Sequence, residues 1–107
     1  MSVLTLRDIE EATFAPFRPG VDAWVLYGTP GAGPAAAVLR YRPGAKVPAH
    51  RHTGHEVVYV LSGSQSDERG THRAGTLVLN VPGSEHEVES AEGCLVLVVW
   101  ESPIEFC

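Results

Sequence analysis

The chain has 107 residues, 44% of them hydrophobic and 20% charged, and a formal net charge of −5 at pH 7. This length supports one domain with a single core. The basic residues are scattered, and Lys46 is the only lysine, so the chain lacks the basic surface that a nucleic-acid partner requires. No apolar run reaches membrane-spanning length and no secretion signal is visible, so we expect a cytoplasmic protein without a membrane partner.

The sequence predicts little helix. A short helix is expected from Leu6 to Ala12, with Thr5 as its cap. The rest consists of short β-prone runs separated by Gly and Pro, which is typical of an antiparallel barrel or sandwich. Residues 28–34 are expected to form a mobile hairpin loop. The candidate strands are Ala23–Tyr27, Ala36–Tyr41, Ala49–His52, Glu56–Leu61, Thr76–Val81, Glu85–Val88 and Cys94–Glu101.

These patterns predict a single all-β domain over residues 1–107, with an N-terminal arm to about residue 20 and a barrel over about 21–102. Alternation orients two of its strands. In the run Glu85–Glu89 the acids share one parity, so His86 and Val88 should face the interior. If Glu56 also faces the interior, the apolar residues between it and Leu61 at the opposite parity face outward.

That apolar outer face, and the outer face of Leu95–Trp100, would need a cover. The N-terminal segment or a second subunit would provide it. We expect a homodimer that buries part of Val57, Tyr59, Leu61 and the outer face of Leu95–Trp100.

The spacing of histidines and a glutamate in residues 44–63 indicates a metal site. Residues 44–63 read Gly-x5-His-x-His-x3-Glu-x6-Gly, which places His50 and His52 on one face of a strand, with Glu56 just after a turn and His86 on another strand. Three imidazoles and one carboxylate form a ligand set for a divalent transition metal. A metal-free barrel with structural histidines is the alternative, but a buried Glu56 without a cation would be costly.

These residues resemble the two motifs of the cupin superfamily, which consists of small jelly-roll β-barrels with one metal inside. Motif one matches at every defined position, whereas motif two departs from the usual pattern at Val81 and Ser90. A narrower resemblance is to the cupin domain of ChrR-type anti-sigma factors. It is carried by Ser66–Gly70, Asn80–His86, Ser90, Gly93–Cys94, Trp24–Tyr27 and Leu39–Gly44.

The resemblance implies a regulatory or sensing module with zinc at the four-ligand site. The ligand set alone does not choose the metal: iron, manganese or nickel would leave coordination positions open, and a small-molecule dioxygenase using Fe(II) is therefore the alternative. A sugar-epimerase-like cupin is a weaker alternative. No catalytic residue and no small-molecule ligand can be named. ChrR-type proteins bind sigma factors through a separate zinc-binding domain, and this chain has no His-x3-Cys-x2-Cys pattern, so sigma-factor binding is not supported.

Two histidines and two cysteines lie outside the predicted site. His55, at the Gly54 turn, is expected to face solvent, with a role supporting the metal ligands as the alternative. His72 is expected to be exposed in a polar hairpin. Cys94 is expected to be a small buried hydrophobe and Cys107 a tail residue, and we expect no disulfide between them.

Overall fold

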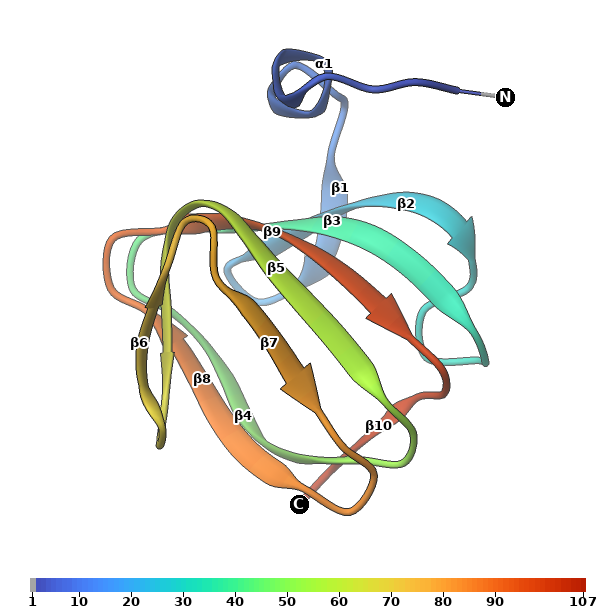
Figure 1. Cartoon of the computed structure of the whole chain (residues 1–107), viewed down its shortest axis with the longest axis vertical. Helices are drawn as coiled ribbons and strands as arrows, with labels where there is room; N and C mark the ends of the chain where they lie inside the picture. Colours follow the sequence, from blue (N-terminus) through green and yellow to red (C-terminus); the bar gives the residue numbers. More distant parts are fainter. Residues whose placement is uncertain (1) are drawn as a thin grey trace.

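The computed structural model describes residues 2–107, which form one short helix and ten strands (Figure 1). The predicted all-β fold is confirmed. No helix in this range is both long and apolar enough to cross a membrane. The elements are α1 (Leu6–Glu10), β1 (Ala15–Arg18), β2 (Val21–Gly28), β3 (Ala35–Tyr41), β4 (Ala45–His52), β5 (Glu56–Asp67), β6 (Gly70–Arg73), β7 (Leu77–Asn80), β8 (Glu85–Ser90), β9 (Cys94–Trp100) and β10 (Ile104–Phe106).

The strands form one curled antiparallel sheet in the order β1-β2-β3-β9-β5-β8-β4-β10, with β6 and β7 also paired to β5. Figure 1 shows the two walls of the resulting half-barrel: β2, β3 and β9 on one side, β4 and β8 on the other. Strands β1 and β10 lie at the two ends of the order. The core between the walls consists mainly of Val, Ala and Leu side chains, closed by Tyr41 and Trp100.

Strand β5 joins the two walls because it bends at Gly63. Its first half pairs with β7 and β9, and its second half pairs with β6 and β8. Gly63 has a φ of +72°, and a Cβ atom there would lie 2.1 Å from the Gly93 carbonyl oxygen. Only glycine tolerates both conditions, so the last position of the histidine motif is a structural requirement of the bend.

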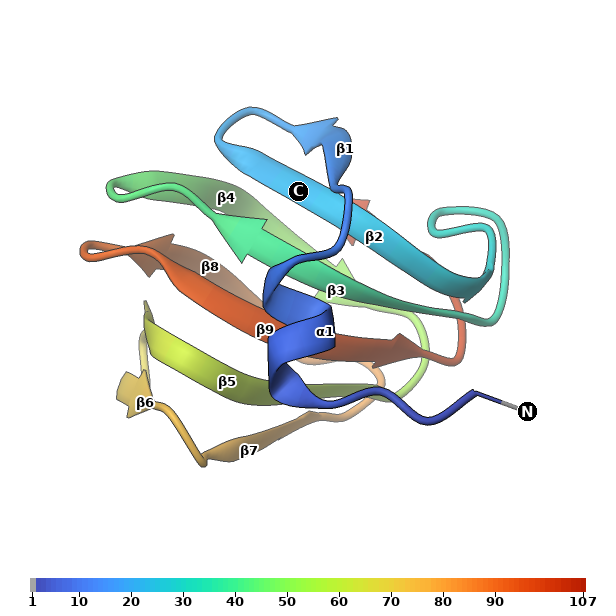
Figure 2. The ribbon, with the colours of Figure 1, turned by 90° about the horizontal axis from the view of Figure 1, so that it is seen from above.

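The N-terminal segment covers part of the outer sheet face. Helix α1 begins with a capping box between Thr5 and Asp8, and Figure 2 shows it lying over β3 and β9. Val38 and Leu95 point away from the core cluster and yet are buried. Tyr59 of β5 stays exposed further along the same face. The N-terminal segment, one of the two predicted covers, therefore accounts for only part of this face.

Candidate metal centre

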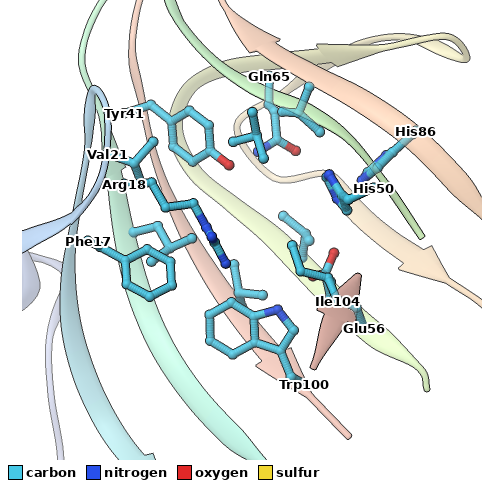
Figure 3. A pocket seen from close by; sticks show the side chains of 15 residues that line it. Phe17, Arg18, Val21, Tyr41, His50, Glu56, Gln65, His86, Trp100 and Ile104 are labelled. Atoms are coloured by element: carbon cyan, nitrogen blue, oxygen red, sulfur yellow. The ribbon is translucent and has the colours of Figure 1, made fainter. Parts of the chain in front are cut away.

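Three predicted ligands meet inside the half-barrel. His50 and His52 come from β4 and His86 from β8, and the strand register places His50 opposite His86. All three are buried, and one ring nitrogen from each lies within 4.8 Å of the others. Their ring centroids are 4.6 to 5.2 Å apart. Figure 3 shows His50 and His86 next to each other on one wall of a cavity.

A bulge in β4 turns its two histidines inward. Ala45 and Val47 face the core in the first half of the strand, and a strict alternation would then bring Ala49 and Arg51 inward. The register to β8 shifts between Val47 and His50, at Pro48, which cannot donate to the ladder. The extra residue reverses the parity, so that the histidines face the core instead.

Each of the three rings is held through its Nδ1 atom. His50 Nδ1 donates to the Pro48 carbonyl oxygen at 2.8 Å, and His52 Nδ1 donates to the Ser84 carbonyl oxygen at 3.0 Å. His86 Nδ1 donates to Asp67 Oδ2 at 3.1 Å. Because these oxygens can only accept, the Nδ1 atoms carry the protons and the Nε2 lone pairs are free. The Nε2 atoms of His52 and His86 are buried without a hydrogen-bond partner in the described residues.

Glu56 lies beside this cluster but outside the group of three. Its Oε1 accepts a hydrogen bond from Asn80 Nδ2 at 2.9 Å and lies 3.3 Å from His52 Nε2. Burial alone would raise the pKa of Glu56, but the contacts with His52 and Asn80 outweigh it and hold that pKa below its ordinary value. The His52 contact lowers this pKa only when the imidazole carries a proton on Nε2 as well. With Nε2 unprotonated, its lone pair and the carboxylate oxygen repel each other unless a positive charge lies between or beside them. A divalent cation fits this donor set.

Burial also favours the neutral form of His50, which lines the cavity. It lowers the pKa of His50 from its ordinary value, although the bond to the Pro48 carbonyl works in the other direction. The positive charge that His86 would carry if protonated lowers the pKa further. A neutral imidazole is the form that binds a metal.

Asp67 is a site residue that the sequence reasoning missed. Its side chain is only 3% exposed, and it accepts hydrogen bonds from His86, His72 and Arg69. Burial by itself would raise the pKa of Asp67, but these three donors hold it well below its usual range. The residue lies within the run Ser66–Gly70 that carried the family resemblance, but that run gave no indication of contact with His86.

Arg69 connects the two sides of the cluster. Its Nη2 lies 2.5 Å from Asp67 Oδ2 and 2.8 Å from Asn80 Oδ1. Asn80 in turn donates to Glu56. His86 and Glu56 are thus joined by a continuous set of hydrogen bonds through Asp67, Arg69 and Asn80, which fixes two predicted ligands relative to each other.

Comparison with protein families agrees with this geometry. Residues 3–103 match the model of the ChrR Cupin-like domain. The chain belongs to the ChrR cupin-like family. It is 31% identical over 103 residues to the anti-sigma-E factor ChrR of Cereibacter sphaeroides, a match that covers 94% of this chain and 47% of that protein. This ChrR cupin-like chain therefore spans about half the length of its curated relative.

Solved structures share the fold. The Rhodobacter sphaeroides SigE complex with the anti-sigma ChrR matches with a TM-score of 0.73 and 26% identity, covering 86% of this chain and 50% of that chain. The acetylacetone dioxygenase of Acinetobacter johnsonii matches with a TM-score of 0.79 and 16% identity, covering 99% and 77%. The second likeness concerns the fold alone.

The remaining histidines and cysteines divide into confirmed and wrong expectations. His55 is exposed, as expected, and its Nδ1 lies 2.6 Å from Glu101 Oε1. The expectation that His72 is exposed is wrong: its side chain is 16% exposed because its Nε2 donates to Asp67. Cys94 is buried, which raises the pKa of its thiol to about 11, and Cys107 is exposed. Both cysteines are free, as expected.

A cavity of about 40 Å³ adjoins the three-histidine cluster. Apolar side chains, mainly valines, form most of its wall. The polar groups that reach it come from different sides: His50, Glu56 and His86 lie on one side, Arg18 and Tyr41 on the other, and Gln65 between them (Figure 3). The volume corresponds to roughly three water-sized positions. A small ligand would therefore contact both the cluster and the opposite wall.

Proposed function

We propose that this chain is a metal-binding regulatory module that holds one divalent ion on His50, His52, Glu56 and His86. The observation that carries the proposal is the orientation of the histidines. All three Nδ1 atoms are engaged by oxygen acceptors, and two of the buried Nε2 atoms have no partner within residues 2–107. Leaving such atoms unpaired in a barrel interior is costly, and a metal ion satisfies them.

The surrounding residues have distinct roles in this proposal. Asp67 accepts the Nδ1 proton of His86, which orients that ring and makes its other nitrogen a better donor. Asn80 holds the Glu56 carboxylate toward His52. When bound, the ion would supply a positive, Lewis-acidic centre at the end of the cavity.

Zinc is the ion that we propose, because three imidazoles and one carboxylate can close a tetrahedral zinc site, and because the resemblance to ChrR-type cupins implies it. Iron, manganese and nickel remain alternatives. The regulatory role is drawn from the relative named as an anti-sigma factor. We do not assign sigma-factor binding to this chain, because it matches only 47% of that protein.

A small-molecule dioxygenase using Fe(II) is the second candidate. The observation that favours it is the position of Glu56, which lies outside the group formed by the three histidines and is held by Asn80. An ion on three histidines alone would keep positions open for ligands. The residues that line the cavity offer no general base besides Glu56.

Elemental analysis of protein purified without added metal tests the first proposal. We expect one divalent ion per chain, mainly zinc. His52→Ala should lose most of that ion on dialysis against a chelator, because its imidazole belongs to the buried group of three and lies 3.3 Å from Glu56 Oε1. His55→Ala is the matched control, since His55 is exposed and should leave the metal content unchanged. Full stoichiometry in dialysed His52→Ala would contradict the assignment.

Oxygen uptake separates the two candidates. Reconstitution with Fe(II) in air, followed by addition of a small diketone or thiol, should give no substrate-dependent uptake if the chain is a regulatory module. Uptake that is abolished by His86→Ala would favour the dioxygenase.

We also propose that the chain forms a homodimer through the part of the outer sheet face that α1 leaves uncovered. Tyr59, Leu77 and Leu79 are 38%, 62% and 53% exposed there, and the register of β5 and β7 makes them neighbours. A stable interface would bury more than about 1,200 Å² in total. Light scattering at micromolar concentration should give a dimer mass that falls to the monomer mass in Leu79→Glu. A monomer mass for the unaltered chain would contradict this.

A further inference from the structure

Arg18 occupies an unusual position at the mouth of the cavity. It is the last residue of β1, and its guanidinium carbon lies 4.6 Å from the centroid of the Phe17 ring and 4.8 Å from that of Phe106. Phe106 belongs to β10, so the side chain connects the two ends of the sheet order. Figure 3 shows the guanidinium extending into the cavity between Tyr41 and Trp100.

The charge of Arg18 has no acidic partner in the described part of the chain. Every other lysine and arginine there has a carboxylate oxygen within 4.0 Å, although most of those side chains are well exposed. The pairs are Arg7–Glu11, Arg40–Asp22, Arg42–Asp22, Lys46–Glu89, Arg51–Glu105, Arg69–Asp67 and Arg73–Glu92. Arg18 is half-buried and lines the cavity, so the cation that is hardest to solvate is the one left unpaired.

Aromatic contacts alone do not account for this placement. They stabilise the cation, but they leave the planar fork of guanidinium N–H groups without acceptors. Glu56 also lines the cavity, but it lies beyond 4.0 Å and is held at the opposite side by Asn80 and His52. If the ion of the proposed function is bound, it neutralises Glu56, and Arg18 then has no anion at all.

Tyr41 adds a second donor next to Arg18. Its side chain is buried among the cavity residues, and Figure 3 shows its hydroxyl directed into the cavity. Burial raises the pKa of Tyr41 well above its ordinary value, so the hydroxyl stays protonated at neutral pH and can donate. A guanidinium fork beside a hydroxyl donor is an arrangement that suits a carboxylate.

We propose that the cavity binds a small carboxylate, with its charged group paired to Arg18 and Tyr41 and its other end directed toward the three-histidine cluster. The orientation toward the cluster rests on the proposed metal function, whereas the pairing with Arg18 does not. The volume of about 40 Å³ limits the ligand to a few non-hydrogen atoms. Formate and acetate are therefore the appropriate probes.

An NMR titration of the isotope-labelled full chain with acetate tests the proposal. We expect saturable shifts of the amide signals of cavity residues such as Val58 and Val98. Acetamide, which has the same shape but no charge, should bind at least about tenfold more weakly, since a charge-assisted hydrogen bond is replaced by a neutral one. This comparison uses the unaltered chain, so it does not depend on the folding of a variant.

Variants then locate the charged group. Arg18→Met should weaken acetate binding by about tenfold or more, while Arg42→Met, which removes an exposed arginine that does not line the cavity, should not change it. Equal binding of acetate and acetamide, or unchanged binding in a folded Arg18→Met, would overturn the inference. No saturable shift with acetate up to high millimolar concentration would overturn it as well.

Running the titration on chelator-treated and zinc-loaded protein keeps this inference apart from the proposed function. Acetate binding that depends on Arg18 in protein that takes up no metal would support the inference while the metal proposal fails. Stoichiometric zinc without acetate binding would support the metal proposal and overturn the inference.

Discussion

The two sides of the cavity are held together by different interactions. On the side of the cluster, His50, His52 and His86 come from strands paired within the sheet, and each ring has a named hydrogen-bond acceptor. At the mouth, β1 and β10 come from opposite ends of the sheet order, and the stacking of Arg18 on Phe106 is a contact between them. The histidine side is held in place by hydrogen bonds without an ion, whereas the mouth has an unpaired positive charge with which an anionic ligand would pair.

The largest effect should come from breaking the organised side at Asp67. Asp67→Ala removes the acceptor of the His86 Nδ1 proton and should lower zinc affinity by about 10- to 100-fold, measured by competition with a chelator. Asp67→Asn keeps an acceptor without the charge, so its zinc affinity should lie between those of Asp67→Ala and the unaltered chain. Glu92→Ala, which removes an exposed carboxylate, is the control. Unchanged affinity in Asp67→Ala would show that the ring does not need this support.

Acidification should have a smaller effect, which also arises on the side of the histidine cluster: it should lower the free energy of unfolding. The folded pKa of His50 lies below its ordinary value of 6.5, so the unfolded chain takes up a proton first as the pH falls. The stability that depends on this difference is present above pH 6.5 and is lost as the pH falls below it. Urea unfolding of metal-free protein should therefore give a lower free energy at pH 5.5 than at pH 7.5, by up to about 1 kcal/mol.

His50→Gln isolates that contribution. The difference in unfolding free energy between the two pH values should shrink in this variant, because the titrating ring is gone. A difference of the same size would assign the pH dependence to other groups.

The smallest effect on stability should come from substituting Arg18 at the mouth of the cavity. Arg18→Met should change the free energy of unfolding by less than about 1 kcal/mol, because losing the aromatic contacts is offset by removing an unpaired, half-buried charge. Urea unfolding in the absence of carboxylates checks this. A loss of several kcal/mol would mean that Arg18 holds the sheet ends together rather than serving a ligand.

Local patterns were sufficient for much of the fold and for the histidines. The acids of Glu85–Glu89 correctly placed His86 inside, and the two-residue spacing correctly placed His50 and His52 on one face. All seven predicted strands are present, with shifted ends. Strand β5 runs beyond the predicted Leu61 because Gly63 bends it instead of ending it. Strands β1, β6 and β10 were missed because each is short and none has the run of apolar β-prone residues that marks the equally short β7.

The sequence could not reveal the contacts between distant residues. Asp67 and His86 are 19 positions apart, and their contact depends on how β5 bends onto β8. The exposure of His72 was predicted wrongly for the same reason, since its partner is that same aspartate. Arg18 meets Phe106 only because the curl of the sheet brings its ends together. Periodicity determines which face a side chain occupies, but not what it meets there.

The pairing of β10 with β4 has a practical consequence for handling this protein. Ile104 lies opposite His52, and Phe106 lies opposite His50. The backbone of Cys107 donates to the Ala49 carbonyl, so the chain end is attached to the strand that carries two predicted ligands. An affinity tag fused after Cys107 would begin beside those predicted ligands, and a polyhistidine tag there would compete for the ion that we propose. A tag before α1, which lies on the outside of β3 and β9 (Figure 2), would not interfere with measurements of metal content and zinc affinity.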